Sequence, residues 1–352
     1  MATIHDVASL AGVSIATVSN VLNQNGKVTK KTEAAVLDAI AQLGYVPDYV
    51  KRSKKSTMTR TIGVITENIC VSFASHMTYG ISKFCHENGY QLMLSDLHMI
   101  THRKLHQDFI YDNLLKDQDF IRKLQSSVEL LKNSGVQGIV YVGDHARDIT
   151  PLLAHIPLPC VAVHSYTQKQ ANCFCVNVDD QYSAQIIVEQ LLKAGHSNIG
   201  IITGPTDSLV THKRLMGYQE ALMKHRVALN PANIYAGHWD YDDGKEALHY
   251  FIKLPNPPSA IFAMNDLMGI GVMNEAHKLN IQIPEQLSVA GFDCLEAALY
   301  SEPPLSTLRI PFDKMGYYAV KTLVESLHTP PDSHSLLIPG ELVPGGTIAS
   351  LK

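Results

Sequence analysis

The chain has 352 residues, 45% of them hydrophobic and 18% charged, which is an ordinary composition for a globular protein. This length is enough for more than one hydrophobic core, so we expect two or three domains. No apolar run approaches the roughly 20 residues that a membrane-spanning helix needs, and the first residues lack a secretory signal. We therefore expect a cytoplasmic protein with no membrane partner.

The charge is divided unevenly along the chain. Residues 1–60 contain eight lysines and arginines and four acidic residues, a net charge of +4, whereas the remainder carries 21 basic and 29 acidic residues, a net charge of −8. A small basic segment ahead of an acidic body is typical of a module that binds a polyanion, joined to a domain that does not. On charge alone, a solvated basic tail remains the alternative.

The cysteines give little sign of a disulfide framework or a metal centre. None of the six belongs to a CxxC motif and most lie in apolar segments, so we expect reduced, buried thiols. The pair in Cys173-Phe174-Cys175 leaves open a metal or a labile disulfide as the minor alternative. We expect no bound metal and no cofactor. The cysteines are Cys70, Cys85, Cys160, Cys173, Cys175 and Cys294.

The first 45 residues contain three helical patterns, each with a capping residue at its start. Thr3 and Asp6 have the spacing of a capping box, and Gly12 ends the first pattern. Ser14 can cap a second pattern and Thr29 a third, and apolar residues recur at helical spacing within each. Two short helices joined by a tight glycine turn, with a third to close the core, are typical of a helix-turn-helix unit.

The outer face of the second helical pattern carries Ile15, Ala16, Thr17 and Asn20, an unusual surface for contact with water alone. Asparagine can pair with adenine through two hydrogen bonds, and isoleucine and alanine can pack on a thymine methyl group. This face therefore favours contact with DNA bases. The alternative, that Ile15 belongs to the core, is weaker because Val18 and its apolar neighbours already supply the inner face.

This N-terminal segment resembles the head of the lactose/galactose repressor (LacI/GalR) family. The resemblance is carried by the pattern Thr3-Ile4-x-Asp6-Val7-Ala8-x-x-Ala11-Gly12-Val13-Ser14-x-x-Thr17-Val18-Ser19-x-Val21-Leu22-Asn23, and it extends over essentially the whole chain. It implies a sequence-specific transcription regulator, a repressor, that binds double-stranded operator DNA as a homodimer and associates with the nucleoid when bound. It implies DNA contacts from Thr3, Ser14, Ile15, Ala16, Thr17, Asn20, Asn23, Tyr45, Arg52, Lys54 and Lys55.

We divide the chain into a helix-turn-helix domain at 1–46, a linker at 47–60 and a sensor at 61–352. Four basic residues of the linker, among them Arg52 and Lys55, make a second phosphate-binding patch. In the resembled family each linker inserts a leucine into the minor groove and kinks the operator, and the matching position here is Lys54. We therefore expect weaker operator bending than in leucine-containing relatives. A solvated, unstructured linker remains the alternative in the absence of DNA.

The sensor alternates short apolar runs with helical patterns, which predicts parallel sheets covered by helices. In such sheets ligands bind at the carboxyl ends of the strands. The resemblance implies two doubly wound parallel-sheet lobes of the periplasmic-binding-protein type, so the expected fold is a small all-α head plus an α/β sensor. The runs are Ile62-Gly63-Val64-Ile65, Gln91-Leu92-Met93-Leu94, Gly138-Ile139-Val140-Tyr141-Val142, Val161-Ala162-Val163, Ile199-Gly200-Ile201-Ile202, Ala260-Ile261-Phe262-Ala263 and Ser288-Val289-Ala290-Gly291-Phe292.

Polar and aromatic residues near the ends of these runs match the family's effector positions. They suit a sugar, because amide and carboxylate groups bond vicinal hydroxyls, arginine donates in a fixed fork and an aromatic face covers the ring. Trp239 as a packed loop residue and Asp293 as a group that only orders its loop remain alternatives. His164 stands where relatives often carry an acid, which leaves the effector's identity open. The expected effector-binding residues are Phe73, His164, Arg214, Trp239, Asn265 and Asp293.

The stretch His98–Gln118 is an insertion relative to shorter members of the family. Its three histidines, His98, His102 and His106, have the spacing of one helix face, which leaves open a metal site. Because basic residues lie among them, we prefer a solvated helix.

The sequence also bears on other classes of function. The chain has no nucleophile elbow, phosphate-binding loop, zinc-protease helix or dinucleotide-binding glycine motif, so we expect no catalytic residues and no enzyme activity. A sugar-processing enzyme or a solute-binding protein fused to a DNA-binding module is the alternative. The helix-turn-helix head favours a regulator over both, and the lack of a signal peptide also opposes a solute-binding transport component.

Overall fold

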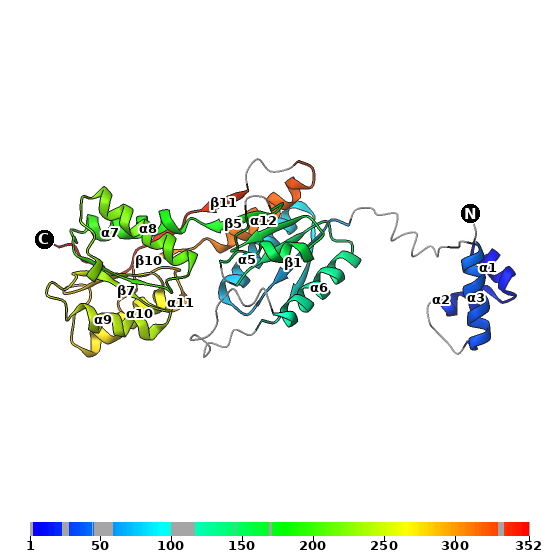
Figure 1. Cartoon of the computed structure of the whole chain (residues 1–352), viewed down its shortest axis with the longest axis horizontal. Coiled ribbons are helices and arrows are strands. Elements are labelled where there is room, and N and C mark those ends of the chain that lie inside the picture. The colour runs from blue at the N-terminus through cyan, green and yellow to red at the C-terminus, as the bar shows by residue number, and fades with distance from the viewer. Residues whose placement is uncertain are drawn as a thin grey trace. The chain divides into compact units, whose positions relative to one another are not determined.

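The computed structural model describes residues 3–22, 28–43, 45, 59–99, 117–144, 146–168, 171–329 and 334–351. The chain divides into two compact units, the head at 1–59 and the sensor at 60–352 (Figure 1). Within the described ranges, no helix is both long enough and apolar enough to cross a membrane. The functional division at 1–46, 47–60 and 61–352 stays a prediction, because most of the linker lies outside those ranges.

The head consists of α1 (Ile4–Ala11), α2 (Ile15–Leu22) and α3 (Lys30–Leu43). The predicted capping box is confirmed: the Asp6 carboxylate accepts from the Thr3 backbone N–H at 2.8 Å, and the Thr3 hydroxyl accepts from that of Asp6 at 3.3 Å. Ser14 likewise caps α2, where its hydroxyl accepts the Thr17 N–H at 3.2 Å. Gly12 adopts a left-handed φ of 64°, which glycine tolerates without a Cβ clash, and so ends α1.

Three valines, Val7, Val18 and Val36, are completely buried in the core of the head, one from each helix. Ala8, Ala39 and Tyr45 complete this core. The apolar residues recur at intervals of three or four, so each helix turns one stripe inward and leaves its other face to solvent.

The sensor has two lobes, each built on a parallel sheet (Figure 1). The N-lobe sheet has the order β11-β5-β4-β3-β1-β2 and the C-lobe sheet the order β7-β6-β8-β9, which confirms the doubly wound fold. The N-lobe strands are β1 (Thr61–Thr66), β2 (Gln91–Asp96), β3 (Ile139–Val142), β4 (Cys160–Val163), β5 (Phe174–Val178) and β11 (Ser335–Ile338). The C-lobe strands are β6 (Ile199–Thr203), β7 (Ile234–Ala236), β8 (Ala260–Ala263) and β9 (Ser288–Ala290).

Helices cover both faces of each sheet, which is why the central strands read as continuous apolar runs rather than as alternating patterns. The N-lobe helices are α5 (Ser72–Asn88), α6 (Gln118–Asn133), α12 (Phe312–Ser326) and the 3-10 helix η2 (Thr150–His155). The C-lobe helices are α7 (Asp180–Lys193), α8 (Leu209–Lys224), α9 (Tyr241–Phe251), α10 (Asp266–Lys278), α11 (Glu296–Leu299) and the 3-10 helix η3 (Pro231–Asn233).

The chain passes between the lobes three times: from β5 to α7, from β10 (Thr307–Arg309) to α12, and from β11 to β12 (Glu341–Val343). The first and last crossings are tied together, because the Asp179 N–H donates to the Ile338 carbonyl at 3.0 Å. Strands β10 and β12 pair antiparallel. These crossings place the start of α7 and the start of α12 at the junction of the lobes.

The cysteines are free thiols, and four of the six are buried as expected. The expectation of burial is wrong for Cys70, which is exposed, and only partly right for Cys294, which is intermediate. Cys173 and Cys175 share the apolar cluster that α6 covers, and neighbouring thiols and burial raise the pKa of both groups. Because both side chains lie in this apolar cluster, these two act as core residues.

Candidate functional site

Helix α2 turns the predicted base-reading residues outward. Ile15 is 40% exposed, and Ala16 and Asn20 are exposed, whereas Val18 on the opposite side is completely buried. Ile15 is therefore not part of the core of the head. Thr17 is half-buried, and its hydroxyl lies 2.9 Å from that of Ser14. Contact of these residues with DNA stays a prediction.

The other predicted DNA contacts fall into two groups. Thr3 and Ser14 are exposed at the starts of α1 and α2, so each has a capping role in the head whatever it does on DNA. Tyr45 is only 8% exposed and packs in the core of the head, and its role as a phosphate contact stays a prediction. Asn23, Arg52, Lys54 and Lys55 lie outside the described residues.

Arg214, in the second turn of α8, is the centre of the C-lobe half of the candidate effector site. Its Nε donates to Asp180 at 2.9 Å, and its Nη1 donates to the Met264 carbonyl and lies 3.6 Å from the Asp293 carboxylate. The guanidinium also lies 3.7 Å from the ring centroid of Phe292. A buried guanidinium with this many partners has one available geometry, so Arg214 is preorganised.

Trp239 lies against this arginine and is fixed by a hydrogen bond from Asn265. Its ring is 5.7 Å from the Arg214 guanidinium, and its carbonyl accepts the Asn265 side-chain amide at 3.0 Å. Gly204 makes room for the indole, because a Cβ there would overlap the ring. Asn265 also caps α10 by accepting the Met268 N–H at 2.9 Å. Trp239 is thus packed in its loop, as one of the two interpretations expected, and its ring also faces Arg214.

Asp293 follows β9 and is the most strained of the site residues, with a φ of 105°. Burial raises the pKa of its carboxyl to about 7, although Arg214 opposes this rise. Beneath it, the carboxylate of Asp266 accepts from the Thr307 hydroxyl and the Leu295 N–H, both at 2.6 Å. Left-handed backbone conformations at His164, Trp239 and Asp293 are costly and typical of functional loops.

The N-lobe half of the site is aromatic. The ring of Phe73, at the start of α5, lies 5.3 Å from His164 and 5.5 Å from Phe312. His164 Nδ1 is 3.3 Å from the Gly143 carbonyl, and burial lowers the pKa of the imidazole. Asp180 raises that pKa and the Arg214 charge lowers it, so the N-lobe histidine lies within the electrostatic reach of the C-lobe pair.

The structure thus joins Arg214, Trp239, Asn265 and Asp293 in direct contact on one lobe and Phe73 with His164 on the other. The sequence reasoning missed Asp180, Phe292 and Phe312, which touch these residues. Asp180 and Phe312 begin α7 and α12, the first helices after two lobe crossings, and Phe292 follows β9. The signal that could have found Asp180 was the strand β5 before it, which has the same apolar character as the strands that were predicted.

A buried polar network under the N-lobe edge was also missed. The Glu67 carboxylate, directly after β1, accepts from the Tyr141 hydroxyl, from Arg147 and from the Asp144 N–H at 3.0 Å. Burial and the neighbouring Glu67 charge raise the pKa of the Asp144 carboxyl to about 6. Because Gly143, which contacts His164, is adjacent to Asp144, this network supports the N-lobe half of the site.

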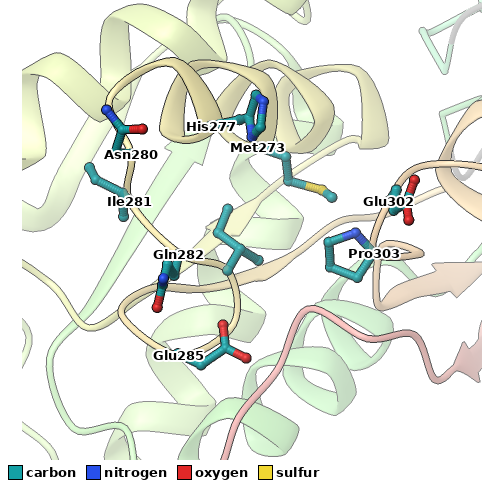
Figure 2. Close-up of a pocket in the computed structure, with 9 residues that line it drawn as sticks. Met273, His277, Asn280, Ile281, Gln282, Glu285, Glu302 and Pro303 are labelled. Atoms are coloured by element: carbon teal, nitrogen blue, oxygen red, sulfur yellow. The ribbon is translucent and has the colours of Figure 1, made fainter.

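Two further features lie outside this site. His98 is exposed and its Nδ1 lies 2.8 Å from the Asp96 carboxylate, whereas His102 and His106 lie outside the described residues. A surface pocket of about 540 Å³ lies at the end of α10, and Figure 2 shows His277 and Met273 on the helix beside it. It contains none of the predicted effector residues.

Both the head and the sensor are similar to known proteins. A family model described as "Bacterial regulatory proteins, lacI family" matches residues 3–48, and one for a periplasmic binding protein-like domain matches residues 188–348. The repressor PurR of Vibrio atlanticus is 31% identical over 329 residues, which cover 93% of this chain and 92% of that protein. The ribose operon repressor of Haemophilus influenzae is 29% identical over 338 residues, 96% of each chain.

Two solved structures show the same fold. The lac repressor dimer bound to operator and the anti-inducer ONPF has a TM-score of 0.66 and 23% identity, with 99% of each chain covered. A complex of the regulator CelR with cellobiose has a TM-score of 0.63 and 24% identity, covering 99% of this chain and all of that one. The match of the head to the family model and the 31% identity to PurR over 93% of this chain establish that it belongs to the lacI family of bacterial regulatory proteins: it is a DNA-binding transcriptional regulator and not an enzyme.

Proposed function

We propose that this protein is a homodimeric, cytoplasmic repressor whose affinity for a near-palindromic operator is controlled by a sugar bound between the two sensor lobes. The observation that carries this proposal is the preorganised cluster of Arg214, Trp239 and Asp293, opposite the aromatic N-lobe group of Phe73 and His164. A site held this rigidly in advance loses little entropy when a ligand binds.

The charges around the cluster favour an uncharged polyol over an anion. The Arg214 guanidinium is already paired with Asp180, and the Asp293 carboxylate lies beside the guanidinium. Its positive charge is therefore not available to a phosphate group. Hydroxyl groups can donate to the Asp293 carboxylate, and a sugar ring can lie on the Trp239 indole. One relative is named a ribose operon repressor and one fold neighbour holds cellobiose, which agrees with this choice.

On DNA, we propose that Ile15, Ala16 and Asn20 read base edges while Ser14 and Thr17 fix the position of α2 on the phosphates. Thr3, Asn23, Tyr45, Arg52 and Lys55 would add backbone contacts. Each protomer of the dimer would place one α2 in the major groove of one half-site. Effector binding would alter the relative populations of the lobe arrangements and thereby operator affinity.

The effector assignment is tested by a thermal-unfolding screen of the full chain against D-ribose, cellobiose, their phosphates and free nucleobases. A ligand at about 100 times its dissociation constant should raise the free energy of unfolding by about 2.7 kcal/mol. We expect a sugar to stabilise the protein, and Trp239→Ala and Asp293→Ala to remove the effect. Lys224→Ala, which alters an exposed ion pair at the far end of α8, is the matched control and should keep it.

A nucleobase that stabilises the protein in place of a sugar would overturn the sugar assignment, as would a sugar effect that survives both site variants. Either result leaves the DNA-binding function in place, because that function does not depend on which effector occupies the sensor.

The linker gives a separate test on DNA. Since a lysine cannot wedge between base pairs as leucine does, the full chain should bend its selected operator less than the variant Lys54→Leu. Energy transfer between dyes at the two ends of a short operator duplex measures the bend. Equal bending by the two proteins would show that residue 54 does not act as a wedge.

A further inference from the structure

We propose that Lys213 and Tyr166 form a clasp between the two lobes that positions Arg214 in the effector site. Lys213 belongs to α8 of the C-lobe, and Tyr166 follows β4 of the N-lobe. The Lys213 ammonium donates to the Tyr166 hydroxyl at 3.2 Å and lies 4.3 Å from the centroid of the same ring. The proposal rests on the proposed function, because it assigns these two residues to control of the same site.

The chemistry of the contact suits a clasp. Lys213 and Tyr166 are both half-buried, and no carboxylate in the described part of the chain forms an ion pair with Lys213. Its ammonium is therefore held by the ring face and the hydroxyl together, an arrangement that strengthens as water is excluded. Burial raises the pKa of the Tyr166 phenol, so the phenol stays neutral and accepts the hydrogen bond.

On the N-lobe side, Tyr166 is anchored to the buried network under the site. Its N–H donates to the Arg147 carbonyl at 2.8 Å, and its own carbonyl accepts the Ile149 N–H at 2.9 Å. The Arg147 side chain in turn pairs with Glu67 at the end of β1. Displacement of Tyr166 therefore acts on the strand ends that carry the N-lobe half of the effector site.

On the C-lobe side, the clasp acts on the next residue in the same helix. Arg214 follows Lys213 in α8 and holds Asp180, at the first lobe crossing, and Asp293, in the effector site. Because an α-helix is stiff over two turns, a pull on Lys213 moves Arg214 with it. The contacts thus form one continuous path from Glu67 through Arg147, Tyr166 and Lys213 to Arg214.

This path predicts how the lobes respond when the clasp is broken. Apart from the three chain crossings, side-chain contacts of this kind are what favour the present arrangement of the lobes over more open ones. Loss of the clasp should increase the population of open arrangements and separate the two halves of the effector site. Effector affinity then falls, although neither Lys213 nor Tyr166 touches the effector.

Hydrogen exchange on the full-length, ligand-free protein tests the clasp directly. We expect Tyr166→Leu, a change in the N-lobe, to increase exchange about threefold or more at the C-lobe amides of residues 211–217. Lys213→Met should do the same at the Tyr166 and Ile149 amides. Tyr166→Phe keeps the ring and should have a smaller effect, and Lys224→Met, elsewhere on α8, should have none. Changes confined to the mutated lobe would overturn the proposal.

Binding of D-ribose to the same variants supplies a second readout. Lys213→Met and Tyr166→Leu should each weaken ribose about three- to tenfold, and the double variant should be no weaker than either single one, because both break one contact. Loss of ribose binding in Lys213→Met alone, with Tyr166→Leu unaffected, would mean that Lys213 contacts the ligand and that the clasp is wrong.

If the unmodified protein does not bind ribose, that choice of effector fails, whereas the exchange experiment still decides the clasp. Should Lys213→Met not fold, the Tyr166→Leu and Tyr166→Phe pair decides it.

Discussion

On α2 of the head, Asn20 is exposed and Val18, two residues earlier, is completely buried. In the sensor, by contrast, Arg214 is only 6% exposed and joins Asp293, in the candidate effector site, to Asp180 at the first lobe crossing. The head therefore keeps its proposed base-reading residues separate from its core, whereas in the sensor the proposed ligand-binding arginine is itself buried and paired. Function and stability should separate under mutation in the head and change together in the sensor.

The largest effect is expected from Arg214→Ala. This change leaves the buried Asp180 carboxylate without its cation, so it should lower the free energy of unfolding by about 3–5 kcal/mol and also abolish effector binding. Arg214→Lys should not restore either property, because an ammonium cannot serve Asp180 and the Met264 carbonyl at once. Urea unfolding of the full chain measures the loss.

Lys224→Ala is the exposed counterpart on the same helix, and because solvent screens its ion pair it should cost far less stability than Arg214→Ala. If the arginine and lysine variants lost similar stability, the contrast between a buried and a surface ion pair would be incorrect for this protein.

The next largest effect is expected in the head, where loss of stability and loss of operator binding should separate most clearly. Val18→Ala removes buried apolar surface and should destabilise the head by about 2 kcal/mol. Asn20→Ala should change stability by less than about 0.5 kcal/mol and yet weaken specific operator binding by about 1–3 kcal/mol. Calorimetric unfolding and DNA titration of the two variants provide the comparison. A stability loss in Asn20→Ala as large as that in Val18→Ala would contradict it.

A smaller effect is expected where Trp239 packs on Gly204. An alanine at position 204 would overlap the indole, so Gly204→Ala should cost about 1–2 kcal/mol and displace the ring from Arg214. In a Trp239→Ala background the same change should cost much less, because nothing remains to be displaced. Thermal unfolding of the unmodified protein, the two single variants and the double variant tests this coupling. If the losses of stability in the single variants simply add in the double variant, the cost of Gly204→Ala does not come from overlap with the indole.

The pH dependence of stability gives the smallest effect. Burial raises the pKa of Asp293 from 3.8 to about 7, so its contribution to stability is fully present below about pH 4 and is lost as pH rises through about 7. The free energy of unfolding of Asp293→Asn should therefore fall less between about pH 5 and 8 than that of the unmodified protein. Some slope remains from Asp144 and Asp266, whose pKa values are raised to about 6. Parallel profiles would mean that Asp293 is ionised throughout this range.

Some features could be predicted from neighbouring residues alone. The capping box of Thr3 and Asp6 and the turn at Gly12 involve residues within four positions of each other, and both are present in the structure. The seven apolar runs coincide with β1, β2, β3, β4, β6, β8 and β9. Strands β5, β7, β10, β11 and β12 were not anticipated. Three of these, β7, β10 and β12, have only three residues, and short strands depend on pairing partners rather than on local pattern.

The candidate site was predictable residue by residue but not as a set of contacts. Phe73, His164, Arg214 and Asp293 could each be proposed from the resemblance to the lacI family, and all but Arg214 also follow a predicted strand. Their partners could not. Asp180 and Phe312 belong to helices that begin at lobe crossings, and no local pattern indicates where a chain passes from one lobe to the other.

The amino-acid sequence by itself therefore determined the helices of the head, the central strands of both sheets and the family of regulators to which the chain belongs, because each depends on short-range patterns of apolar and capping residues. Only the tertiary structure decided which side chains meet. It brought Arg214 to Asp180 and Tyr166 to Lys213, because parallel sheets gather strand ends from distant parts of the chain at one edge and the three crossings set the two lobes against each other.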